Sequence, residues 1–97
     1  MRAILFNQTA NVTTAALPLS SIYNKADSEH WTVLCSGTFG GATIELQVKG
    51  PSGDWVTSEE VTFTEPGYRV TPLSPSVSVR AVASGATGTT NVTLEIG

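Results

Sequence analysis

The sequence predicts an all-β fold, an antiparallel β-sandwich of the Ig-like or jelly-roll-like kind with seven to nine short strands. Apolar and polar residues alternate along most of the chain, which is typical of strands with one buried face. Turn residues separate these runs at intervals of roughly 8–12 residues, the spacing typical of sandwiches and barrels. The best helical candidate, residues 19–26, lacks a second apolar turn, so no helix longer than two turns is expected. The 97 residues are enough for a single domain, residues 1–97.

The first half of the chain contains four expected strands. Residues 4–6 lie in an apolar run, and residues 11–16 form the second expected strand. Residues 30–36 and 43–49 alternate strictly, so that in each strand the apolar residues share one face. The core residues expected from these two alternating strands are Trp31, Val33, Cys35, Ile44, Leu46 and Val48.

The second half of the chain contains five more expected strands. They cover residues 55–58, 61–64, 68–71, 76–84 and 91–96. The last two show the clearest alternation, and turns rich in Gly and Pro lie between the strands. The core residues expected from these last two strands are Val77, Val79, Val92, Leu94 and Ile96.

A glycine cluster at Gly37, Gly40 and Gly41 raises the question of a phosphate-binding loop. Such a loop needs a helix behind it, whose free N–H groups bind the phosphate, and a Lys-Ser or Lys-Thr pair. A strand pattern follows here, and that pair is missing. The glycines are therefore predicted to form a turn that requires positive φ angles. Residues 50–54 are predicted to be a hairpin loop by the same reasoning.

The low content of charged residues argues against some kinds of binding partner. Only 13% of the residues are charged and the net charge is −3, whereas about 25% charged residues is usual. The five Lys and Arg residues do not cluster, so direct binding of nucleic acid is not expected. No apolar stretch is long enough for a signal peptide or a membrane helix, so no membrane partner is expected. Cys35 is the only cysteine, which excludes an internal disulfide and fits folding in a reducing cytoplasm.

The titratable residues do not form a recognisable catalytic pattern. His30 and Cys35 are five residues apart on one strand, so they point to opposite faces, and Glu29 adds only one more ligand. Asp54 could approach Glu59 and Glu60 across a hairpin to bind a cation, but solvated carboxylates explain them better. Paired carboxylates for glycoside hydrolysis stay open, although a small sandwich offers little cleft. We therefore expect no enzyme activity, no cofactor and no metal.

Three aromatic residues could form a platform for sugar. Trp31 alternates in phase with the expected core, and Tyr68 follows Pro66-Gly67 as a corner residue would. The side of the strand on which Trp55 lies stays ambiguous. Arg80 is expected on an outer face, where it would be solvated, pair with a carboxylate or reach a partner.

The turn chemistry resembles that of small virion proteins of tailed bacteriophages. The segments that carry the resemblance are SGTFGGATIELQVKGPSGDWV, TFTEPGYRV and PSVSVRAVASGAT, and the resemblance covers Trp31 to the C-terminus. The resemblance implies a capsid decoration or cement protein on the virion surface, made in the cytoplasm of the bacterial host. It also implies the major capsid protein lattice as partner and a homo-oligomer, with a trimer as one option. It implies no catalytic residues.

Binding to a lattice needs contact area and shape rather than reactive groups. Residues 1–19 are expected to be either an assembly arm or an edge strand of the sandwich. The alternative function is a carbohydrate- or receptor-binding module of a tail or fibre, for which exposed aromatic residues at one loop end would speak. The expected partner-binding residues are Ile4, Leu5, Phe6, Phe39, Tyr68 and Arg80.

Overall fold

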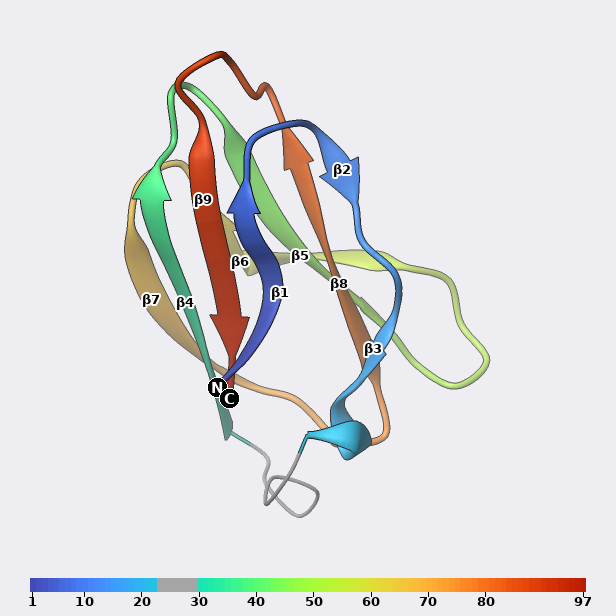
Figure 1. Ribbon diagram of the computed structural model, residues 1–97. Helices are drawn as coiled ribbons and strands as arrows, with labels where there is room; N and C mark the ends of the chain where they lie inside the picture. The colour runs from blue at the N-terminus through green and yellow to red at the C-terminus, as the bar shows by residue number, and fades with distance from the viewer. Residues whose placement is uncertain (23–29) are drawn as a thin grey trace.

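Two antiparallel sheets pack face to face in the computed structural model, which describes residues 1–22 and 30–97 (Figure 1). Sheet A has the strand order β1-β9-β4-β7, and sheet B has the order β2-β8-β5-β6, with β3 also paired to β8. The predicted all-β sandwich is confirmed. The strands are β1 (Arg2–Gln8), β2 (Val12–Thr13), β3 (Leu17–Pro18), β4 (His30–Thr38), β5 (Thr43–Lys49), β6 (Val56–Phe63), β7 (Gly67–Pro72), β8 (Ser78–Ser84) and β9 (Asn91–Ile96).

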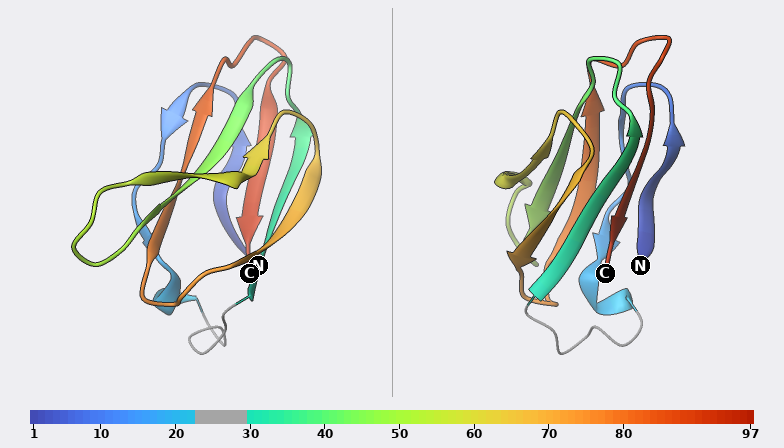
Figure 2. Two further views of the ribbon diagram at one scale, coloured as in Figure 1. Left: turned by 180° about the vertical axis from the view of Figure 1, so that it is seen from behind. Right: turned by 90° about the vertical axis from the view of Figure 1, so that its left-hand side faces the viewer.

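The pairing of the strands is that of a jelly roll. With β2 and β3 counted as one interrupted strand, the first strand pairs with the eighth, the second with the seventh, the third with the sixth and the fourth with the fifth. A folded ribbon of nested pairs that wraps into two sheets defines this architecture. Figure 2 shows the two layers edge-on, with the ribbon crossing from one to the other at the ends of the strands.

Three of the expected strands differ in number or continuity from the observed ones. The segment expected as one strand at 11–16 pairs with β8 only at Val12–Thr13, and a second short bridge to β8, Leu17–Pro18, lies just beyond it. The segments expected as separate strands at 55–58 and 61–64 belong to β6, which contains a bulge. Opposite β5, the register moves from Glu45↔Thr62 to Gln47↔Thr57, so residues 58–61 of β6 bulge out of the ladder. A bulge interrupts the alternation, which is why the sequence pattern indicated two strands.

The only helical element in the described part of the chain is the 3-10 turn Leu19–Ser21. Its Leu19 side chain is fully buried. Residues 23–26 of the helical candidate lie outside the described residues.

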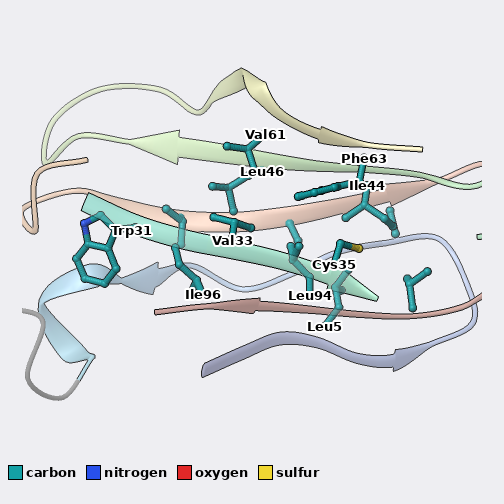
Figure 3. Packing of buried hydrophobic residues seen from close by; sticks show 14 of the residues in the cluster. Leu5, Trp31, Val33, Cys35, Ile44, Leu46, Val61, Phe63, Leu94 and Ile96 are labelled. Atoms are coloured by element: carbon teal, nitrogen blue, oxygen red, sulfur yellow. The ribbon is translucent and has the colours of Figure 1, made fainter. Parts of the chain in front are cut away.

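The core lies between the inner faces of the two sheets, as Figure 3 shows for the middle of the molecule. Trp31 is fully buried, and its indole Nε1–H donates a hydrogen bond to the Leu73 carbonyl at 3.0 Å, so the burial leaves no polar atom unpaired. Of the expected core residues, Val48 and Val77 lie at the margin and are only partly buried. The fully or nearly fully buried ones are Trp31, Val33, Cys35, Ile44, Leu46, Val79, Val92, Leu94 and Ile96.

Gly40 and Gly41 of the glycine cluster form a turn between the two sheets, as predicted, whereas Gly37, which also has a positive φ, lies within β4. The Ala42 N–H donates to the Phe39 carbonyl at 3.0 Å, and between them Gly40 and Gly41 have φ angles of 60° and 93°. The β8–β9 loop holds this turn in place. The Thr90 hydroxyl donates to the Phe39 carbonyl at 2.8 Å, and the Thr87 hydroxyl donates to the Gly40 carbonyl at 2.7 Å. No helix follows the turn, and its backbone is held by the protein itself.

Candidate interaction surfaces

Two of the expected partner-binding residues are core residues instead, so these expectations are wrong. Leu5 is 2% exposed and Phe39 is 6% exposed. The register of β1 shifts between Ala3 and Leu5, and this irregularity turns Leu5 inward, opposite Leu94 of β9 (Figure 3). Phe39 belongs to the buried cluster at the turn between the sheets. Neither side chain is presented to a partner.

Ile4 is half-buried beside a hollow between β1 and the segment that links β2 to β3. Residues 2–4 and 14–17 line this hollow, which has a volume of about 220 Å³ and is open to solvent. Sites for small molecules usually enclose roughly 300–1,000 Å³. The hollow is therefore too small and too open to hold such a ligand in the way that an enzyme site does.

Most of the exposed large apolar side chains gather on the outer face of sheet A. Phe6 of β1 is 73% exposed, Tyr68 of β7 is 65% exposed, and Val70 of β7 is 57% exposed. Met1 also belongs here, because it lies beside Gly97, which pairs with Thr32 of β4. We name this surface the A face and define it by its outward residues Met1, Phe6, Thr32, Leu34, Ser36, Tyr68, Val70, Thr93 and Glu95.

The A face carries little charge. Leu34 lies in register between Tyr68 on one side and Glu95 on the other, and both Leu34 and Glu95 are half-buried. Glu95 carries the only charged side chain among the residues that define the A face. The expected partner-binding residues included Phe6 and Tyr68; Met1 lies in the segment 1–19 that was expected as an arm or edge strand, and Val70 was not named. Val70 could have been found, because it is two residues from Tyr68 on one strand and so shares its face.

The outer face of sheet B is polar and contains a cation–aromatic cluster. Gln47 lies in register between Thr57 of β6 and Arg80 of β8. Its amide oxygen accepts a hydrogen bond from Arg80 Nε at 2.7 Å, and its amide nitrogen donates to the Thr57 hydroxyl at 3.3 Å. The Arg80 guanidinium lies 4.3 Å from the centre of the Trp55 ring. Arg80 is thus on an outer face, as expected, and Trp55 lies on the same face.

The histidine and the cysteine of the described part of the chain do not face each other. His30 is exposed and Cys35 is buried, so the two lie on opposite faces of β4. Burial raises the pKa of the Cys35 thiol to about 11, although a backbone hydrogen bond at Ser36 acts in the other direction. Within residues 1–22 and 30–97, no three His, Cys, Asp or Glu residues lie close enough together to hold a metal ion. Glu29 lies outside the described residues.

Over the same described ranges, no helix has the length and apolar character needed to cross a membrane. Comparison of the chain with protein-family models, with curated proteins and with solved structures gives no match.

Proposed function

We propose that this chain is a structural protein of a bacteriophage virion, a capsid decoration or cement protein that stabilises the head lattice by binding it. The observation that carries the proposal is the A face, where four large apolar side chains are exposed around a single carboxylate. Exposed apolar surface of this kind is typical of protein–protein contacts. The resemblance of the turn sequences to small phage virion proteins supports the same function.

The A face suits binding to a large protein assembly on physical grounds. Specific contacts between proteins bury at least about 1,000 Å² in total, and this needs a broad surface. Few charges on the surface mean that little free energy is lost in removing charged groups from water. A protein that binds the assembled lattice and not its free subunits stabilises the assembly by mass action. The proposed partner is therefore the major capsid protein lattice, and the proposed place is the capsid surface.

The contact is proposed on the A face rather than on a detached N-terminal arm. Residues 2–8 form the edge strand β1, which pairs with β9 inside the sandwich. Removal of residues 1–6 would expose the backbone of β9 and the core around Leu5, so it would test folding as much as binding. Point substitutions in the A face avoid this difficulty.

The test compares two matched substitutions in binding to phage heads that lack the decoration protein. Val70→Thr changes the A face, whereas Val56→Thr makes the same chemical change at an exposed position of β6 outside it; the two valines are 57% and 65% exposed. Val70→Thr should lower the occupancy per head, because apolar contact is lost, and adding Tyr68→Ser should bring the loss to at least tenfold. Val56→Thr should leave it unchanged.

Several outcomes would overturn this proposal. Failure of the wild-type protein to bind heads would remove the lattice function, and equal binding by all variants would remove the A face from it. Binding of the wild-type protein to host-surface glycan instead of heads would favour the alternative, a carbohydrate- or receptor-binding module of a tail or fibre. That alternative calls for exposed aromatic residues at one loop end; in the structure the exposed aromatics Phe6 and Tyr68 lie on strands of sheet A, and Phe39 is buried.

A further inference from the structure

We propose that the cluster around Trp55 on the outer face of sheet B is a binding site for a carboxylate-bearing sugar, such as a uronic acid unit of an acidic polysaccharide. The site, named the Trp55 cluster, consists of Trp55, Arg80, Lys49, Gln47 and Thr57. It is separate from the A face, and the proposal does not depend on the lattice function.

Two cations meet over one aromatic ring in this cluster. The Arg80 guanidinium lies 4.3 Å from the centre of the Trp55 ring, and the Lys49 ammonium lies 5.9 Å from it. The chain has only five Lys and Arg residues and a net charge of −3. The convergence of two of the five on one side chain therefore makes a local positive site on an acidic protein.

The backbone places all five side chains on one face. Gln47 is opposite both Thr57 and Arg80 in the ladders of sheet B. Lys49 follows Gln47 by two residues on β5, and Trp55, just before β6, precedes Thr57 by two residues. Even spacing along a strand keeps side chains on the same side of the sheet. Because Leu46 and Val79 face the core, this side is the outer one.

Hydrogen bonds hold the guanidinium in place before any ligand arrives. Arg80 donates through Nε to Gln47, and Gln47 donates to Thr57, so one chain of contacts crosses three strands. Within the described residues, Arg80 has no carboxylate partner, and its Nη1 and Nη2 groups make no hydrogen bond to the protein. These groups can bind both oxygens of one carboxylate. Preorganisation of this kind lowers the entropy cost of binding.

The surroundings favour an acidic sugar over other anions. Two cations are too few to follow a nucleic acid backbone, which presents closely spaced phosphates. Glu45, two residues from Gln47 on the same face of β5, and Asp54, next to Trp55, limit the positive charge of the cluster, so one carboxylate at a time suits it best. A sugar carries one carboxylate among several hydroxyl groups. Hydroxyl-bearing residues of the same face, Thr57, Thr62 and Ser78, can hydrogen-bond to those groups, and the half-buried Trp55 can contact the C–H groups of a ring.

The test uses the signals of the two tryptophan indole N–H groups in nuclear magnetic resonance spectra of the 97-residue protein. Trp55→Phe assigns the signals, and Trp31, whose indole is hydrogen-bonded inside the core, serves as an internal reference. Addition of trigalacturonate should shift the Trp55 signal in a saturable way and leave the Trp31 signal in place. The methyl-esterified trimer, which has no carboxylate, should cause no shift.

A matched pair of variants separates the cluster from general charge. Arg80→Gln should weaken trigalacturonate binding at least tenfold. Arg69→Gln removes the same charge from another cation–aromatic contact, with Phe63 at 5.0 Å, and should leave binding unchanged. Absence of a Trp55 shift in the wild-type protein, or equal loss in both variants, would overturn the proposal. Tighter binding of hexaglutamate than of trigalacturonate would overturn it too, because the cluster would then be a site for acidic peptides.

Discussion

At the scale of single residues, two side chains lie where the sequence did not place them. Leu5 and Phe39 were expected at a partner contact, yet both fill the core. From the sequence alone, an apolar residue close to a chain end or a turn looks the same whether it fills the core or contacts a partner. The side chain direction depends on a bulge in β1 and on how the turn at Phe39 folds back, and neither is a periodic feature.

Cys35 should make stability depend on pH in the alkaline range. The thiol has an ordinary pKa of 9.0, and burial raises it to about 11 in the folded protein. Between these values the folded state binds more protons than the unfolded state, so the free energy of unfolding must fall as pH rises from 9 to 11. The full effect is on the order of 2–3 kcal/mol. Below pH 9 the thiol is protonated in both states and contributes no dependence.

Urea unfolding at about pH 8.5 and about pH 10.5, on either side of the ordinary thiol pKa, measures this effect, with Cys35→Ala as the control. Other groups titrate in the same range, but they are shared by both proteins and cancel in the comparison. The wild-type protein should lose more stability than Cys35→Ala over this interval. Identical losses would show that the buried thiol does not couple folding to pH.

At the scale of elements, Gly37 near the end of β4 shows why a glycine is needed next to the turn between the sheets. Gly37 has a φ of 107°, and a Cβ atom at this position would overlap the carbonyl oxygen of Asn91 in β9. Both constraints come from the backbone, which cannot move away without breaking the β4–β9 ladder. Gly88, in the β8–β9 loop, has open space around its Cα and no positive φ. Two glycines in similar turn sequences therefore have different roles.

Gly37→Ala should lower the free energy of unfolding by about 1–3 kcal/mol, because alanine is strained at this φ and meets the Asn91 carbonyl. Gly88→Ala should raise the free energy of unfolding slightly, by less than about 1 kcal/mol, because alanine lowers the entropy of the unfolded chain. Thermal unfolding of the two variants and of the wild-type protein measures this difference in stability. If both variants melt together, the strain at Gly37 is absent.

The strands themselves were predictable where the alternation is strict. The segments 43–49 and 91–96 were expected with the bounds that β5 and β9 have. The bulge in β6 and the interrupted pair β2 and β3 were not, because irregular pairing removes the period of two on which the prediction rests. The hydrogen-bonded row Thr57–Gln47–Arg80 could not be predicted either, since it needs the order of strands in sheet B.

At the scale of the whole molecule, the two sheets share one core, so the sandwich should unfold as a single unit. Leu46 of sheet B and Leu94 of sheet A are both almost fully buried between the sheets. Truncation of either to alanine should cost about 2–5 kcal/mol through lost burial and the cavity that it leaves. Because the core is common, both variants should show one transition, seen alike by tryptophan fluorescence and by circular dichroism.

Two separate transitions in either variant would contradict this picture, because the sheets would then be independent. Ser36→Ala, at an exposed position of β4, is the control and should stay within about 0.5 kcal/mol of the wild-type protein. The buried residues set the stability, whereas the two proposed binding sites are formed by outward-facing residues. The apolar A face and the Trp55 cluster lie on opposite sides of the sandwich, so a protein bound through one side would still present the other.

The nested pairing also has a consequence for synthesis on the ribosome. In sheet A, β9 lies between β1 and β4 and hydrogen-bonds to both, although it is the last of the strands to be translated (Figure 1). Until β9 has left the exit tunnel, β1 and β4 have no strand to join them, and the apolar inner face of sheet A cannot close. Sheet A can therefore close only after residues 91–96 have emerged, so β1 and β4 must wait for β9 before they are joined.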